Sequence, residues 1–186
     1  HGMQATTVPT STARTGTGAK HGPATPKRHR QVLQIARSFV PGGLGGWVIY
    51  NKSLPLAPLA CTIEADERVS AKGDIVHALD EEQLRVSLRE LKSKNIEALA
   101  ASLINSFAND THEKRIRDIA GEELPDIPVS LSSEVVPEMQ EYERTVTTVA
   151  NSYVRPRVAK YVRSLKSKLS IRGEDVKLHI LRSDGG

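Results

Sequence analysis

Residues 96–104 form a run of almost wholly apolar or small side chains between two segments with helical periodicity. Such a run is typical of a β-strand that is covered on both faces, because no position along it is reserved for solvent. The segments around it predict that strands and helices alternate along most of the chain. That alternation predicts an α/β fold.

The segment before this run predicts a capped helix that ends near residues 93–95. Asp80 is a suitable N-cap, and Gln83 at the third helical position completes a capping pair. The expected buried stripe of this helix consists of Leu84, Leu88 and Leu91.

A second capped helix is expected after the run. Asp110-Thr111-His112-Glu113 has the capping-box pattern, and Pro125 ends the helix. Its expected inward-facing residues are Ile116, Ile119 and Ala120.

Prolines and glycines set the other expected boundaries. Pro26 and Pro137 each predict a helix start, and Pro156 predicts a kink or split inside the second of these helices. The remaining expected elements are a strand near 14–17 within a loop-rich region over 1–26, a helix over 27–38, a hairpin of strands over 61–69 and 74–78, a strand over 127–132, a long helix over 137–172 and a final strand over 176–181. We therefore expect a basic Gly/Pro/Thr-rich region over 1–63, followed by an α/β segment over 64–186.

Composition excludes several classes of protein. The 186 residues are 38% hydrophobic, which is enough for a core, and no apolar run approaches the roughly 20 residues needed to span a bilayer. The single cysteine, Cys61, excludes an internal disulfide and a cysteine-clustered zinc site, so a reducing, cytoplasmic compartment is expected. Because the chain begins at His1 and ends on Gly185-Gly186, we expect it to be a piece of a longer protein.

Charge is distributed unevenly. No aspartate or glutamate occurs from His1 to Ile63, a region with seven lysines and arginines. Such a region is open to three interpretations: a solvated face, a phosphate-bearing or nucleotide ligand, or nucleic acid. Nucleic acid is the least favoured, because no stacking aromatics are interleaved with the cations and no RNA-recognition or zinc-finger pattern is present.

Several stretches, in order, resemble one family. They are His1-Gly2 followed by Thr6-Thr7, Arg14-Thr15-Gly16, the stretch 30–37, Glu67-Arg68-Val69, Leu79-Asp80-Glu81, the stretch 105–113, Glu141-Tyr142-Glu143-Arg144-Thr145 and Ser183-Asp184-Gly185-Gly186. Together they resemble the hydantoinase/oxoprolinase A (HyuA-like) family, which includes subunits of acetone and acetophenone carboxylases. The glycine-rich stretch 41–47 is more similar to the ketone carboxylases. Two departures are Met3-Gln4-Ala5, which interrupt the family's HGTT run, and Thr25-Pro26-Lys27, which replace an expected Gly-Phe.

The resemblance implies part of an actin-like ATPase fold (the acetate and sugar kinase, chaperone and actin superfamily) with a two-lobed site for ATP and Mg²⁺. Ser183, Asp184, Gly185 and Gly186 are the expected nucleotide-binding residues, with Asp184 as the metal ligand. Glycines let backbone N–H groups approach phosphate oxygens closely, although a generic tight turn has the same pattern. His1, Thr6 and Thr7 are the expected catalytic residues, suited to a phosphoryl group or an activated carbonyl; the alternative is a simple loop.

The implied activity is ATP-dependent carboxylation of a ketone with bicarbonate, in which phosphorylation activates an unreactive oxygen. The alternatives are an ATP-hydrolysing N-methylhydantoinase or 5-oxoprolinase acting on a cyclic amide, a non-catalytic scaffold subunit with the same fold and, last, a nucleic-acid-binding module. A hydantoinase B-type partner in a hetero-oligomer is implied, and neither nucleic acid nor a membrane is expected as a partner.

Other chemically conspicuous residues are expected to be structural. Glu141, Glu143 and Arg144 fit the first turn of a helix, where acids suit the positive end of the helix dipole. His112 is expected to be an early helix residue, and Cys61 lacks a basic neighbour that would activate it. The three tyrosines expected in the core are Tyr142, Tyr153 and Tyr161.

Overall fold

A computed structural model describes residues 18–37 and 54–171. Its main feature is a parallel four-stranded sheet in the order β2-β1-β5-β6, beside a two-stranded antiparallel ribbon, β3-β4. The strands are β1 (His21–Pro26), β2 (Ile63–Ala65), β3 (Arg68–Val69), β4 (Ile75–His77), β5 (Ala98–Ala101) and β6 (Val129–Leu131). The helices are α2 (Val32–Ile35), the 3₁₀ turn η1 (Leu59–Cys61), α4 (Glu81–Ser93), α5 (Thr111–Glu123), α6 (Ser132–Val135) and α7 (Glu141–Ile171).

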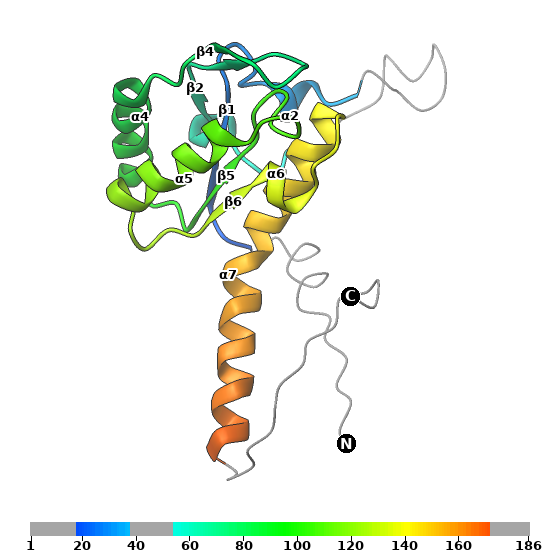
Figure 1. The fold of residues 1–186 in the computed structure, drawn as a ribbon. Helices are drawn as coiled ribbons and strands as arrows, with labels where there is room; N and C mark the ends of the chain where they lie inside the picture. The colour runs from blue at the N-terminus through cyan, green and yellow to red at the C-terminus, as the bar shows by residue number, and fades with distance from the viewer. Residues whose placement is uncertain (1–17, 38–53, 172–186) are drawn as a thin grey trace, which may run out of the picture.

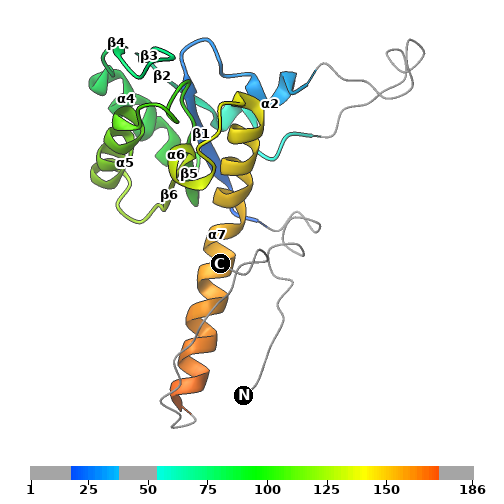
Figure 2. The same cartoon turned by 45° about the vertical axis from the view of Figure 1, so that its right-hand side comes forward.

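Helices cover both faces of the sheet, as Figures 1 and 2 show. In β5, Leu99 and Ala101 join a core cluster with the leucines of α4 and the isoleucines of α5. Ala100, between them, joins a second cluster with Leu33 of α2 and Val149 of α7. Because alternate residues of a strand point to opposite faces, this division confirms the predicted α/β architecture and the doubly covered strand.

The two central helices form where they were predicted, but only one has the predicted cap. Asp80 Oδ1 accepts from the backbone N–H of Gln83 at 3.0 Å, which confirms the cap of α4. The predicted capping box of α5 is wrong: Asp110 makes no side-chain cap bond, and Glu113 points into the protein. Asn109 Oδ1 instead accepts from the N–H of Thr111 at 3.0 Å.

The predicted strand over 61–69 is two strands. β2 pairs in parallel with β1, whereas β3 pairs antiparallel with β4 across a turn in which Gly73 has φ +91°. The chain divides at Asp66 and Glu67. Asp66 forms an ion pair with Lys27, and Glu67 is buried, so the chain leaves one sheet here and enters the other.

The central strand β1 was missed, because a segment rich in glycine and proline predicted loops. Pro26 ends this strand rather than opening a helix, and the predicted helix over 27–38 is reduced in the described residues to the single turn of α2. The chain leaves β1 through Arg28, which has a left-handed φ of +70° and donates its backbone N–H to Glu64 Oε1 at 2.8 Å. A helix cannot begin until this turn is complete.

The long helix is α7, and its second half extends beyond the sheet (Figures 1 and 2). It begins at Glu141 rather than Pro137, and it is continuous through Pro156, so the helix is not split there; a kink at Pro156 stays a prediction. Tyr153 is buried as predicted, whereas Tyr142 and Tyr161 are half-buried. The predicted strands at 14–17 and 176–181 lie outside the described residues.

Candidate functional site

All of the site residues expected from the sequence lie outside the described residues: His1, Thr6, Thr7, Ser183, Asp184, Gly185 and Gly186. Their roles stay predictions. The candidate site that the structure does describe is the edge of the parallel sheet at which its strands have their carboxyl ends. In open α/β sheets, ligands bind outside this edge, because loops from several strands converge there.

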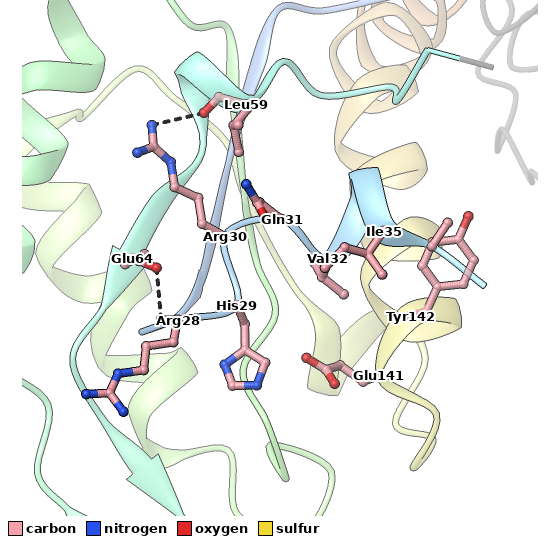
Figure 3. A pocket seen from close by; sticks show the side chains of 11 residues that line it. Arg28, His29, Arg30, Gln31, Val32, Ile35, Leu59, Glu64, Glu141 and Tyr142 are labelled. Carbon is pink, nitrogen blue, oxygen red and sulfur yellow. Dashed lines mark hydrogen bonds between the residues drawn. The ribbon is translucent and has the colours of Figure 1, made fainter. Parts of the chain in front are cut away.

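A hollow of about 600 Å³ lies at the carboxyl end of β1, and we call it the β1 hollow. It lies between the loop that follows β1 and the beginning of α7 (Figure 3). Its lining residues are Arg28, His29, Arg30, Gln31, Val32, Ile35, Ala36, Leu59, Glu64, Glu141 and Tyr142. The set combines cations, carboxylates and aliphatic side chains.

Backbone groups hold the polar side of the β1 hollow in place. Nδ1 of His29 lies 3.0 Å from the carbonyl oxygen of Lys27, and Arg30 donates to the carbonyl of Leu59 at 3.1 Å. Figure 3 shows Arg28 and Arg30 on one side, Ile35 and Tyr142 on the other, and His29 and Glu141 between them. Both arginines and Glu64 therefore lie on one side of the hollow, and Ile35 and Tyr142 lie on the other.

Arg37, two residues after α2, attaches the opposite wall through polar contacts. Arg37 donates from Nε to Glu143 at 2.6 Å and from its terminal nitrogen to Gln140 at 3.1 Å. Burial raises the pKa of Glu143, but the hydrogen bond from Arg37, a backbone hydrogen bond and the charge of Arg37 together outweigh burial and leave the pKa below its ordinary value. The Glu143 carboxylate is therefore ionised at neutral pH and fixes the start of α7 to the segment that follows α2.

A buried carboxylate, Glu113, holds the loops that follow β5 and β6. Its Oε1 accepts from the N–H of Leu103 at 2.9 Å and from Ser132 Oγ at 2.6 Å. Its Oε2 accepts from the N–H and the hydroxyl of Ser133 at 2.9 and 2.8 Å. Four donors on one solvent-excluded carboxylate make it the connection between two strand ends, which is a structural role.

Arg144 of α7 attaches the long helix to the same loop. Its guanidinium donates to the carbonyl oxygens of Leu103 at 2.5 Å and Glu138 at 2.7 Å. It also lies over the ring of Phe107, 5.6 Å from the centroid. Burial lowers the pKa of Arg144, and the side chain is 1% exposed. The structural interpretation made from the sequence is confirmed, although Arg144 bonds to backbone carbonyls and not to a neighbouring acid.

His112 and Glu67 form a buried pair at 2.8 Å that joins α5 to the start of the β3–β4 ribbon. The second carboxylate oxygen of Glu67, Oε1, has no hydrogen-bond partner in the described residues. Burial raises the pKa of Glu67 despite the hydrogen bond from His112. His112 is an early helix residue, as predicted. Its partner Glu67 lies 45 residues earlier in the chain, so no local sequence pattern indicates their contact.

A second hollow, of about 470 Å³, lies between the tip of the ribbon and the loop after β5. Asn109 closes one side of it by donating to the carbonyl of Gly73 at 2.7 Å. Asp74 and Asp110 are among its lining residues. Across residues 18–37 and 54–171, no group of three histidine, cysteine, aspartate or glutamate side chains could hold a metal ion.

Known structures define the class of fold. The nucleotide-free structure of acetone carboxylase, from a study of ATP-dependent acetone carboxylation, matches with a TM-score of 0.80 at 24% identity, over 90% of this chain and 25% of the other. The ATP-dependent caprolactamase of Pseudomonas jessenii matches with a TM-score of 0.82 at 27% identity, over 89% of this chain and 24% of the other. The described residues therefore form part of an actin-like ATPase-type fold, as predicted.

The chain belongs to the hydantoinase/oxoprolinase family. The family's N-terminal region matches residues 2–124, and its hydantoinase/oxoprolinase domain matches residues 144–186. The acetophenone carboxylase gamma subunit of Aromatoleum aromaticum is 34% identical over 143 residues, which are 74% of this chain and 20% of that protein. The caprolactamase subunit alpha of P. jessenii is 27% identical over 184 residues, 99% of this chain and 26% of that protein. The chain thus spans about a quarter or less of the length of these relatives.

Within the described residues, no helix is both long and apolar enough to cross a membrane.

Proposed function

We propose that this chain is part of an ATP-dependent ketone carboxylase subunit, which activates its substrate by phosphorylation. The observation that carries the proposal is the family membership, together with the likeness to an acetone carboxylase and an acetophenone carboxylase subunit. The β1 hollow at the carboxyl edge of the sheet is consistent with it, because substrates of α/β enzymes bind at this edge.

ATP and Mg²⁺ would be held by residues outside the described ranges, with Ser183–Gly186 and Asp184 as our candidates. Within the described ranges, no group of three metal-ligating side chains occurs, and the β1 hollow has no excess of positive charge for phosphate groups. When bound, the nucleotide would supply the phosphoryl group that turns a poor electrophile or leaving group into a good one. His1, Thr6 and Thr7 remain proposed catalytic residues.

The second candidate function is the ATP-dependent opening of a cyclic amide, of the hydantoinase or 5-oxoprolinase kind. The likeness to caprolactamase, which extends over 99% of the chain, favours it. A scaffold subunit with the same fold is the non-enzymatic alternative.

In each case we propose a partner of the hydantoinase B type, since the acetophenone carboxylase, caprolactamase and acetone carboxylase relatives are subunits. The division of the chain near residue 63 and a cytoplasmic location also remain proposals.

Product analysis tests these alternatives. The full-length subunit and its partner are incubated with ATP, Mg²⁺ and bicarbonate, and with either acetophenone or caprolactam. A carboxylase adds CO₂ to the ketone in a bicarbonate-dependent reaction, whereas a cyclic-amide hydrolase adds one water to the lactam without bicarbonate. Mass spectrometry separates the two products. If neither product forms while Mg-ATP still binds, carboxylation and ring opening of these compounds are excluded; if titration also detects no Mg-ATP binding, the scaffold alternative is correct.

A further inference from the structure

We infer that the β1 hollow binds the neutral carbonyl compound on which the enzyme acts, and not the nucleotide. The inference rests on the proposed function and names a place for its substrate. It is carried by the charge balance of the hollow, by its division into polar and apolar sides, and by the contacts that already occupy some of its polar groups.

The first observation is charge. The lining carries two guanidinium groups, Arg28 and Arg30, and two carboxylates, Glu64 and Glu141, so the formal charges of these four groups cancel. One guanidinium is partly used, because Arg30 donates to the carbonyl of Leu59. One carboxylate is partly used as well, because Glu64 accepts from the backbone N–H of Arg28. A lining without net charge has no excess of positive charge for the phosphates of a nucleotide, whereas a neutral polar molecule needs none.

The second observation is the apolar side. Val32 and Ile35 line the hollow here, and Ile35 is 59% exposed. In Figure 3, Val32 and Ile35 lie beside Tyr142, on the side away from Arg28. Hydrocarbon placed against these side chains removes apolar surface from water, which favours binding. The apolar side therefore fits the alkyl or aryl part of a ligand.

The third observation is that the hollow has both a hydrogen-bond donor, Arg28, and an acceptor, Glu141, for a polar ligand. The Arg28 guanidinium has no hydrogen-bond partner in the described part of the chain, although its backbone N–H is bound to Glu64. The guanidinium is directed away from Glu141 and Tyr142 (Figure 3), so it can donate to a carbonyl oxygen placed at the polar end of the hollow. Glu141, an acceptor, lies between the arginines and the apolar side (Figure 3). A cyclic amide offers both a carbonyl oxygen and an N–H, whereas a ketone offers only the oxygen.

Mutation can therefore distinguish binding of a ketone from binding of a cyclic amide. Arg28→Gln removes the cationic donor and is expected to weaken binding of both kinds of compound by about tenfold or more, the range for a hydrogen bond to a charged group. Glu141→Gln removes the strong acceptor and is expected to weaken binding of caprolactam but not of acetophenone. Glu82→Gln, an exposed change on α4, is the matched control and should alter neither.

The experiment has two readouts on the full-length subunit with its partner. Ligand-observed NMR titration with acetophenone or caprolactam, without nucleotide, measures affinity directly. Steady-state kinetics then give KM for the carbonyl compound and for ATP. We expect Arg28→Gln to raise the carbonyl KM about tenfold and to leave the KM for ATP within about twofold. Circular dichroism confirms that each variant is folded.

Two results would overturn the inference. One is an ATP KM that rises in parallel with the carbonyl KM in Arg28→Gln, since the hollow would then serve the nucleotide. The other is unchanged carbonyl affinity in folded Arg28→Gln and in a second variant, Ile35→Asp, which places a charge on the apolar side. Failure of the proposed function gives a different result: the wild-type protein then turns over neither compound. The NMR titration measures binding without turnover, so it still tests the inference in that case.

Discussion

At the scale of single residues, the carboxylate of Glu113 is the group on which the strand-end loops most depend. Glu113→Gln keeps the size of the side chain but puts an amide NH₂ where one carboxylate oxygen accepts from two donors. We expect the opening free energy of these loops to fall by about 1–3 kcal/mol, the penalty for a buried donor left without a partner. Hydrogen exchange at the N–H groups of Leu103 and Ser133 should accelerate about tenfold or more.

The control for this prediction is Glu134→Gln, because Glu134 is an exposed acid that pairs with Arg117 at the surface. Exposed ion pairs contribute about 0–1 kcal/mol, so this change should leave the same amides almost unaffected. Equal exchange rates in wild type and Glu113→Gln would show that the four hydrogen bonds do not hold the loops.

Glu67 gives a prediction about pH. Burial raises its folded pKa, so the carboxyl takes up a proton on folding. Its contribution to stability is therefore fullest below the unfolded pKa and is lost as the pH rises through the folded pKa. Glu67→Gln can still accept from His112 but cannot ionise. The thermal midpoint of the Gln variant, relative to wild type, should increase between about pH 4 and about pH 7.

A difference that stays constant over this pH range would contradict the raised pKa. A difference that changes in the opposite direction would mean that an ionised Glu67 is stabilised by a protonated His112 more than burial disfavours it.

Residue-scale prediction from sequence succeeded where the partner is local. The cap at Asp80 needs only a backbone N–H three residues ahead, and the spacing of the sequence contains that information. Asp110-Thr111-His112-Glu113 has the same pattern, yet Glu113 bonds to residues that fold next to it from β5 and β6. A buried site with four donors outcompetes one exposed N-terminal N–H, and nothing in the local pattern distinguishes the two cases.

At the scale of elements, β1 depends on close contact between its backbone and its neighbours. A Cβ at Gly22 would lie 2.8 Å from the carbonyl oxygen of Cys61 and 3.1 Å from Leu91 Cδ1. Because the first of these is a backbone atom, relief requires a shift of the chain. Gly22→Ala should therefore lower the free energy of unfolding by about 1–3 kcal/mol in urea denaturation.

The matched change is Gly121→Ala in α5, where an added Cβ meets nothing within 4 Å. Alanine is the better helix former, so this change should stabilise the protein by about 0.5–1 kcal/mol. If both variants change stability by the same amount and in the same direction, close packing at Gly22 is not the cause.

Elements with strong periodicity were predictable, and elements defined by their neighbours were not. The leucine stripe of α4 and the apolar run around β5 each follow from residues that lie close together in the sequence. β1 has two prolines in six residues, a composition that normally argues against a central strand. It is a strand because β2 and β5 hold it on both sides.

At the scale of the whole molecule, order along the chain carried the information that single motifs did not. Stretches from one end of the sequence to the other identified the family and, through it, the class of fold. The β1 hollow was not predictable in this way. It joins residues 28–32 to residues 141–142, and only the packing of α2 against α7 brings them together. The seven expected site residues lie at the two ends of the chain, outside the described ranges.

The central claim is that a carbonyl compound is activated at the expense of ATP. Its most direct measurement is the rate of phosphate release from Mg-ATP by the full-length subunit with its partner, with and without acetophenone or caprolactam. We predict a slow basal rate that one of the two compounds raises at least about tenfold, with half-maximal stimulation at that compound's KM. Phosphate release that neither compound changes, from a folded complex that binds Mg-ATP, would contradict the claim.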